Sequence, residues 1–265
     1  MTTLGVFSVR ADGATTVAIG LAAVLAARAR TLLVDLNLDN PEVADFLDID
    51  PQTGIWTLAH NAQLAPVGRE DLEAAIGWRD GIAVLPGIVR RVEPELISDH
   101  FLTGLLEAAG REFEHIVVDL GRVRVQPPVP LASGRLLWVG TPTPLGTQAL
   151  ERRYWQLEEG GEEWLRRTSL VLNRASPQSF VGVERYAQSE YGLVTTGVIP
   201  EAVEFWRGVE IHHSPQALNM SAALTQDARY PKLHGAEALS VRQAFEALAD
   251  HITAAPAELA TAGRT

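Results

Sequence analysis

The sequence predicts an α/β protein with three layers, α/β/α, built around a mostly parallel sheet. Short apolar runs rich in branched residues alternate along the chain with longer segments of helical periodicity. Repeated strand–helix–strand units of this kind form parallel sheets whose two faces are covered by helices. Polar residues directly follow several of the apolar runs, and the carboxyl ends of parallel strands are where such sheets bind ligands.

The individual elements follow from hydrophobic periodicity and from residues that start or stop a helix. We expect a proline to begin the helix Pro41–Leu47 and a glycine to close the helix Ser98–Gly110. Strands are predicted at Leu4–Val9, Thr31–Leu36, Ile82–Leu85, Glu114–Leu120, Leu136–Gly140, Ser169–Asn173 and Val194–Ile199. Helices are predicted at Thr15–Arg28, Pro41–Leu47, Arg69–Gly77, Ser98–Gly110, Gly146–Glu158, Val181–Tyr191 and Glu237–Ile252.

The length and composition favour one domain. A chain of 265 residues with 46% hydrophobic and 21% charged residues can bury a single large α/β core. The sequence has no internal repeat and no linker long enough to divide it. We therefore expect one domain over residues 1–253, followed by a flexible Ala/Thr/Pro-rich tail over 254–265.

The charge and the missing residue types exclude several function classes. The formal net charge is −11, and the basic residues form scattered pairs at Arg90-Arg91, Arg152-Arg153 and Arg166-Arg167. Nucleic-acid binding needs a clustered positive surface, so we expect no nucleic-acid partner. The chain has no cysteine, which excludes disulfides and thiolate chemistry. No signal peptide is expected, and the longest apolar run, Val17–Ala27, is too short for direct membrane insertion, so we expect a cytoplasmic protein.

The loop after the first strand has the layout of a phosphate-binding loop. Ser8-Val9-Arg10-Ala11-Asp12-Gly13-Ala14-Thr15-Thr16 connects an apolar strand to a helix that opens on Gly-x-Thr-Thr. In a P-loop of this form, backbone N–H groups and a lysine hold the phosphates. Ala14 stands at the lysine position, and the only lysine of the chain is Lys232. The sequence therefore predicts the scaffold of a P-loop without its central positive charge.

Four segments carry a family resemblance, in the expected order and spacing. They are Ser8–Leu25, Thr31–Asn37, Phe113–Asp119, and Leu170–Arg174 continued by Gly197–Glu201. These segments are similar to the K-G-G-x-G-K-T-T loop, the V-D-x-D strand, the Walker B strand and the adenine-side V-x-N-[KR] and G-x-I-P-[ED] segments of one family. The chain thus resembles the MinD/ParA family of deviant Walker P-loop ATPases.

The resemblance implies a nucleotide site and a magnesium site. We expect the residues of this nucleotide site to be Arg10, Gly13, Thr15, Thr16, Asn173, Arg174 and Pro200, although Arg10 replaces a glycine of the family loop. Thr15, Asp35 and Asp119 are the Mg²⁺ ligands that it implies for any nucleotide-bound state. A homodimer is the expected assembly, since members of this family dimerise around nucleotide.

The departures from the family pattern predict an impaired enzyme. Ala14 and Val9 replace the two lysines of the loop, and Asn37 replaces the second acid of V-D-x-D. Phosphoryl transfer depends on positioning and on charge neutralisation, so we expect a pseudo-ATPase without catalytic residues, whose nucleotide site is vestigial or weak. No cofactor is expected. The alternative is a slow ATPase that binds ATP or ADP with Mg²⁺ and uses Arg10 in place of lysine.

Three further segments resemble one particular branch of this family. Val34–Leu38 continued through Val43–Leu47, the strand end Val84–Gly87 and Thr141-Pro142 are similar to the CpaE/TadZ branch of pilus-assembly proteins. This implies a positioning or assembly scaffold with protein partners from a secretion, pilus or cell-positioning system, recruited by a partner to a pole or membrane complex. A septum-placement regulator on the same fold is the alternative.

Overall fold

The computed structural model describes residues 1–50, 54–87, 96–123, 128–132, 134–159, 163–176, 179, 182–201 and 236–254. The strands are β1 (Thr2–Ser8), β2 (Thr31–Asp35), β3 (Gly77–Arg79), β4 (Ile82–Leu85), β5 (His115–Arg122), β6 (Arg135–Gly140), β7 (Thr168–Ala175) and β8 (Thr195–Pro200). The helices are α1 (Ala14–Ala26), α2 (Val43–Leu47), α3 (Ile55–Asn61), α4 (Arg69–Ala75), α5 (Asp99–Glu112), α6 (Val129–Ala132), α7 (Pro144–Glu159), the 3-10 helix η2 (Glu163–Arg167), α8 (Val183–Tyr191) and α11 (Ala236–Thr253).

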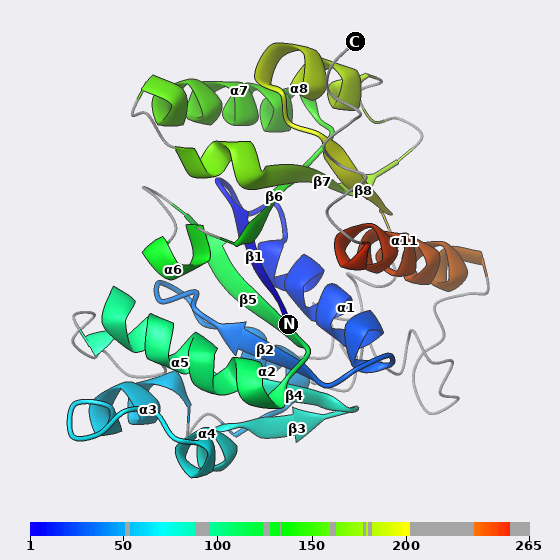
Figure 1. Ribbon diagram of the computed structural model, residues 1–265. Helices are drawn as coiled ribbons and strands as arrows, with labels where there is room; N and C mark the ends of the chain where they lie inside the picture. The colour runs from blue at the N-terminus through cyan, green and yellow to red at the C-terminus, as the bar shows by residue number, and fades with distance from the viewer. Residues whose placement is uncertain are drawn as a thin grey trace.

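One eight-stranded sheet forms the centre of the molecule (Figure 1). Its strand order is β3-β4-β2-β5-β1-β6-β7-β8, and every pairing is parallel except that of β3 with β4. β1 therefore lies in the middle, between β5 and β6. The predicted fold class, a three-layer α/β/α arrangement around a mostly parallel sheet, is confirmed.

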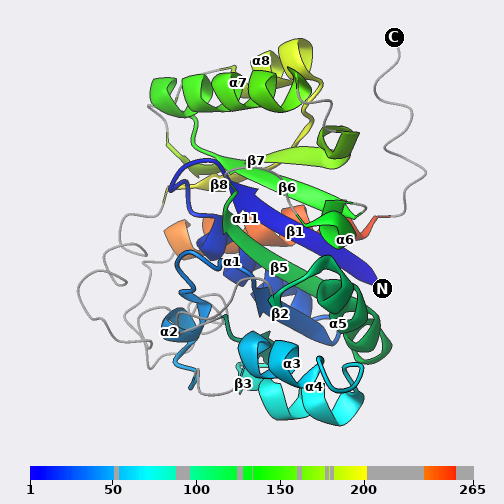
Figure 2. The same cartoon turned by 90° about the vertical axis from the view of Figure 1, so that its left-hand side faces the viewer.

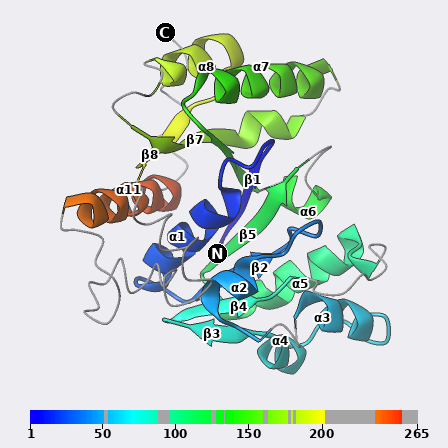
Figure 3. The same cartoon turned by 180° about the vertical axis from the view of Figure 1, so that it is seen from behind.

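Two apolar layers sandwich the sheet because successive side chains of a strand point to opposite faces. On β1, Leu4 and Val6 pack with α1 and α11, whereas Phe7 packs with α5 and with Trp138 and Trp164. Figures 1 and 3 show α1 and α11 together on one face of the sheet. The helices α5 to α8 cover the other face, and α3 and α4 extend that layer below β2 and β4.

Most predicted helix ends differ from the structure by one or two residues. The helix predicted to end at Gly77 ends at Ala75, because Gly77 instead begins β3. Two other differences also have a local cause. α5 continues through Gly110 to Glu112, because its hydrogen-bonded ladder runs on to Phe113 and the glycine instead allows close approach of Met1. Ser98 begins this helix as predicted, its hydroxyl accepting a hydrogen bond from the Phe101 N–H at 3.2 Å. α2 begins at Val43 rather than Pro41.

Four short elements were not predicted from the sequence: α3, β3, α6 and η2. β3 and β4 form a hairpin through Asp80 and Gly81, both of which have positive φ angles, of 49° and 83°. Asp-Gly is a typical sequence for a two-residue hairpin turn, so the hairpin of β3 with β4 could have been predicted from the sequence. The other three elements span only four to seven residues, too few for periodicity to identify them.

Some predictions lie outside the described residues. These include Arg90-Arg91, Lys232 and the tail after Ala254. The division into one domain of residues 1–253 stays a prediction. Among the helices that the structure describes, none has the length and apolarity needed to cross a bilayer.

Replacing Leu248 by alanine is expected to destabilise the fold by about 2–5 kcal/mol, because the leucine is fully buried between α11 and the sheet. Its Cδ1 lies so close to Gly197 of β8 that a Cβ there would sit 3.0 Å away. Urea unfolding monitored by circular dichroism measures the change. Gln243→Ala, on the exposed side of the same helix, is the matched control and should stay within about 0.5 kcal/mol of wild type. Equal stability of the two variants would contradict the packing of α11 on β8.

Candidate functional site

The loop between β1 and α1 lies at the carboxyl edge of the sheet, where the sequence placed it. Gly13 precedes α1 with φ 90° and ψ 36°, a left-handed conformation that favours glycine. A Cβ at this position would come within 2.6 Å of the Asn173 side-chain nitrogen. Glycine at position 13 is therefore required both by backbone conformation and by the approach of β7.

Asn173 ties this loop to β7. Its Nδ2 donates a hydrogen bond of 2.9 Å to the backbone carbonyl of Asp12, and the residue is 1% exposed. Its Oδ1 has no hydrogen-bonding partner among the described residues. The resemblance implied that Asn173 lies beside the adenine, whereas its hydrogen bond in this structure is to the loop. The side chain therefore acts as a brace that sets the position of the loop.

Asp12 is a site residue that sequence reasoning did not select. The residue is only 6% exposed, and its carboxyl group accepts a hydrogen bond from the Thr141 hydroxyl at 3.1 Å. Burial raises the pKa of Asp12, while the hydrogen bond from Thr141 and the charges of Arg10 and Arg174 lower it. The available signal was that Asp12 is the only acid of the loop, at the position where the family motif is variable.

The residue at the lysine position and the two arginines near the loop differ in their exposure to solvent. Ala14 is 4% exposed and packs into the apolar layer under α1. Arg10 is exposed, and its backbone carbonyl accepts a hydrogen bond from the Ser8 hydroxyl. Arg174 is exposed with φ 58° at the end of β7, where it acts electrostatically on Asp12. Two arginines, both at the rim, thus accompany one buried acid.

The remaining residues that were predicted to bind nucleotide lie at the same edge of the sheet but differ in their exposure to solvent. Thr15 is buried in the first turn of α1, and Thr16 beside it is half-buried. Pro200 pairs with Ala175 at the end of β8 and is also half-buried. The fold therefore brings the loop, the end of β7 and the end of β8 to one edge, as the resemblance implied.

Asp35 and Asp119 lie side by side on neighbouring parallel strands and are fully buried. The two Asp35 oxygens accept hydrogen bonds from the backbone N–H groups of Asn37 (3.0 Å) and Val43 (3.1 Å). Burial, and then the charge of Asp119, raise the pKa of Asp35 to about 8. The bond to Val43 also explains why α2 begins at that residue.

Asp119 is less completely satisfied. One of its oxygens accepts a hydrogen bond of 2.9 Å from the Gly121 N–H, while Oδ2 has no partner within hydrogen-bond distance among the described residues. Burial raises the pKa of Asp119 to about 6, although the Thr15 hydroxyl and the Gly121 N–H favour the charged form. The orphaned oxygen is the atom of this site with unused capacity for a cation.

Hard oxygen donors of this kind suit Mg²⁺. Thr15 and Asp119 fit that ion, since the Thr15 hydroxyl lies near the carboxylate that keeps a free oxygen. Asp35 fits less well as a direct ligand, because each of its oxygens already accepts a backbone hydrogen bond. Within the described ranges, no group of three or more His, Cys, Asp or Glu side chains forms a metal site by itself.

Asn37 replaces an acid of the family pattern and has a structural role here. Its Nδ2 donates to the Asn40 carbonyl at 2.6 Å. The side chain also lies directly over Gly121, where any Cβ would collide with it. Asn37 therefore packs the turn after β2 against the end of β5.

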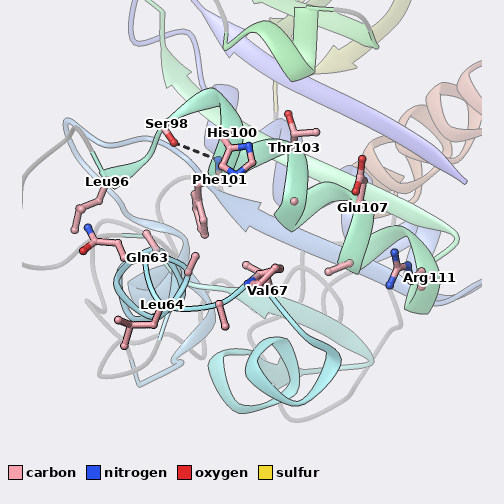
Figure 4. Close-up of a pocket in the computed structure, with 16 residues that line it drawn as sticks. Gln63, Leu64, Val67, Leu96, Ser98, His100, Phe101, Thr103, Glu107 and Arg111 are labelled. Carbon is pink, nitrogen blue, oxygen red and sulfur yellow. Dashed lines mark hydrogen bonds between the residues drawn. The ribbon is translucent and has the colours of Figure 1, made fainter.

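A hollow of about 710 Å³ lies away from this edge, between α5 and the connection from α3 to α4 (Figure 4). Leu64, Val67 and Phe101 contribute apolar surface, and His100, Glu107 and Arg111 lie along α5. None of the predicted site residues lines it. The hollow is therefore separate from the candidate site.

Solved structures with the same fold come from the ParA and MinD ATPases. A ParA family ATPase from Chlorobium tepidum TLS has a TM-score of 0.74 at 16% identity, covering 94% of this chain and 97% of that one. The septum site-determining protein MinD of Pyrococcus horikoshii OT3, complexed with Mg-ADP, gives 0.65 at 20% identity, covering 100% and 99%. The MinC:MinD cell division complex of Aquifex aeolicus gives 0.65 at 16%, covering 95% and 96%. At these identities the likeness shows the fold, which is that of the ParA/MinD P-loop ATPases.

Sequence comparison is more limited. No family model matches the chain. A curated relative is the succinoglycan biosynthesis transport protein ExoP of Rhizobium meliloti (strain 1021), which is 30% identical over 146 residues. The match covers 51% of this chain and 18% of that protein, so the chain spans less than a fifth of the length of this relative.

Replacing Asp119 by asparagine is expected to stabilise the protein at pH 8 by about 2 kcal/mol. The folded protein holds protons on Asp119 and Asp35 more tightly than the unfolded chain does. The free energy of unfolding therefore falls as pH rises from about 4 through about 6 for Asp119, and on to about 8 for Asp35. Denaturant unfolding at pH 4 to 9 should show a shallower fall for Asp119→Asn.

The control is Asp45→Asn, an exposed acid on α2, which should leave the pH dependence unchanged. An unaltered pH dependence in Asp119→Asn, together with lower stability at pH 8, would show that the buried carboxyl pair does not hold these protons.

Proposed function

We propose that the protein is a catalytically impaired member of the ParA/MinD fold group that works as a positioning or assembly scaffold through protein partners. The observation that carries this proposal is the charge of the phosphate loop. Asp12 places a buried carboxyl group there, and Ala14 packs into the core at the lysine position. A triphosphate carries several negative charges, and its transfer requires cations that neutralise them.

The cations that remain are poorly placed to offset this loss. Arg10 and Arg174 are exposed, and both act on Asp12. A guanidinium binds phosphate well, but the charges of these two arginines are already partly offset by the Asp12 carboxylate. Nearby, Asp35 and Asp119 add two more acidic groups. These features support a pseudo-ATPase whose nucleotide site is vestigial or weak, and in which no residue is catalytic.

The process and the partners are inferred from the comparisons and from the motifs. The relative ExoP is named for biosynthesis transport, and the segments noted above resemble the CpaE/TadZ branch. We therefore place the protein in a secretion, pilus or cell-positioning system, cytoplasmic and recruited to a pole or membrane complex by a protein partner. The MinC:MinD structure shows that a protein of this fold binds a protein partner.

A slow ATPase is the second candidate, favoured by one observation. The Mg²⁺-side groups are retained, since Thr15 lies near Asp119 and the carboxylate keeps an unpartnered oxygen. In that case Arg10 would supply the charge of the missing lysine and hold ATP or ADP with Mg²⁺. A septum-placement regulator is a variant of the first candidate and differs from it in the partner.

Calorimetric titration with ATP and with ADP, each with excess Mg²⁺, separates the two candidates. We expect no saturable heat up to about 1 mM nucleotide, equivalent to a binding free energy weaker than about 4 kcal/mol. Arg10→Ala is the paired variant and should give the same result. Micromolar binding to the wild type that disappears in Arg10→Ala would overturn the pseudo-ATPase and favour the slow ATPase.

We also expect a homodimer that does not depend on nucleotide. Sedimentation equilibrium should give a mass of twice 28.7 kDa, in the presence of EDTA as well as with Mg²⁺ and ATP. The physical reason is that the charges that would bridge two subunits through ATP are absent from positions 9 and 14. A monomer that dimerises only when Mg²⁺ and ATP are added would contradict this proposal.

A further inference from the structure

A second hollow, of about 700 Å³, lies at the amino ends of β1, β6 and β7, beside the end of α11. In Figure 2 the N-terminus and the red end of α11 lie on the same side of the sheet. The basic residues that line this hollow are Arg135, Arg166, Arg167 and His251. The hydroxyl-bearing lining residues are Thr2, Thr3, Thr168, Ser169, Thr196 and Thr253. None of the described residues that line it is an aspartate or a glutamate.

The sheet register brings the arginines together. Leu136 of β6 is paired with Thr168 of β7, so Arg135 and Arg167, which directly precede these two residues, lie at the same end of neighbouring strands. Neighbouring strands are about 4.8 Å apart. Arg166 lies next to them in η2 and is exposed, and no ion pair of Arg166 with another described residue occurs. One of the arginine pairs seen in the sequence, Arg166-Arg167, thus joins Arg135 in one cluster.

The cluster has donors available for a ligand. Arg135 uses one Nη1 donor on the Ile252 carbonyl at the end of α11, which leaves the rest of its guanidinium fork. The His251 Nε2 is shielded from solvent and has no hydrogen-bonding partner among the residues that the structure describes. An anion held beside such donors accepts charge-assisted hydrogen bonds from them.

We infer that this pocket, which we call the amino-edge pocket, binds a small phosphorylated anion. The volume suits a small molecule, since ligand sites typically measure about 300–1,000 Å³. Guanidinium forks match phosphate bidentately, and hydroxyls and imidazole complete such sites. The chain as a whole carries a net charge of −11, so a pocket whose described lining residues include no acid stands out as an anion site.

The amino-edge pocket is distinct from the phosphate loop. Thr2 begins β1 at the pocket, whereas the loop follows Ser8 at the other end of the same strand. A strand of this length spans about 20 Å. Binding at the pocket therefore neither requires nor contradicts the proposed function, because that proposal concerns the opposite edge of the sheet.

Titration calorimetry with pyrophosphate at constant ionic strength tests the inference. We expect a dissociation constant on the order of 0.1 mM for the wild-type protein. The double variant Arg166→Ala/Arg167→Ala should weaken binding at least tenfold. Arg152→Ala/Arg185→Ala is the matched control, since it removes the same charge from exposed positions on α7 and α8 and should keep wild-type affinity.

Two further variants separate the pocket from charge and from the loop. Arg166→Lys/Arg167→Lys keeps the charge but removes the guanidinium forks, and it should lose part of the affinity. Arg10→Ala should bind as well as wild type. Thermal melting of each variant checks that it is folded.

The inference is overturned by any of three results. The first is absence of binding up to about 10 mM pyrophosphate. The second is equal loss of affinity in the two double-alanine variants, or loss in Arg10→Ala. The third is tighter binding of hexaglutamate or of a short DNA duplex than of pyrophosphate, which would assign the pocket to an acidic protein segment or to nucleic acid.

Discussion

The carboxyl edge of the sheet is organised by two buried carboxyl groups, those of Asp35 and Asp119, which face each other on adjacent strands. Buried acids must be satisfied by donors or hold a proton. Asp35 takes the backbone N–H groups of Asn37 and Val43, which fixes the turn after β2 and the start of α2. Its carboxyl also needs a glycine at position 87, where a Cβ would lie 3.0 Å from Cγ. Loops from three strands thus converge on one pair of side chains.

The family-like residues that the chain keeps are those with contacts inside the protein. Gly13 allows the close approach of Asn173, which donates a hydrogen bond to the Asp12 carbonyl. Asp35 accepts a hydrogen bond from the Val43 N–H at the start of α2. The lysines that are absent would have pointed at a ligand instead. Stability alone can therefore account for the retained residues without any selection for nucleotide binding. Among the described residues of this site, the free Oδ2 of Asp119 and the Oδ1 of Asn173 lack such an internal explanation.

The strands and the edge that holds the site could be predicted because apolar runs and strand ends are local signals. Ile82–Leu85 was predicted with the bounds the structure gives, and the other strands differ by one or two residues at their ends. The hydrogen bond from Thr141 to Asp12 joins residues 129 positions apart, so no local pattern announces it. The role of Asn173 as a brace was likewise hidden, because it depends on the left-handed turn at Gly13.

The distribution of charge differs from that expected of a phosphate-binding fold. Parallel α/β sheets bind anions at their carboxyl edge, where helix N-termini point. In this chain that edge collects Asp12, Asp35 and Asp119, while Arg135, Arg166 and Arg167 gather at the amino edge, near the carboxyl end of α11. A helix C-terminus favours cations, which explains why arginine is stable there, as the bond from Arg135 to Ile252 illustrates. The proposed anion site thus lies at the amino edge, opposite to the edge where parallel α/β sheets ordinarily bind anions.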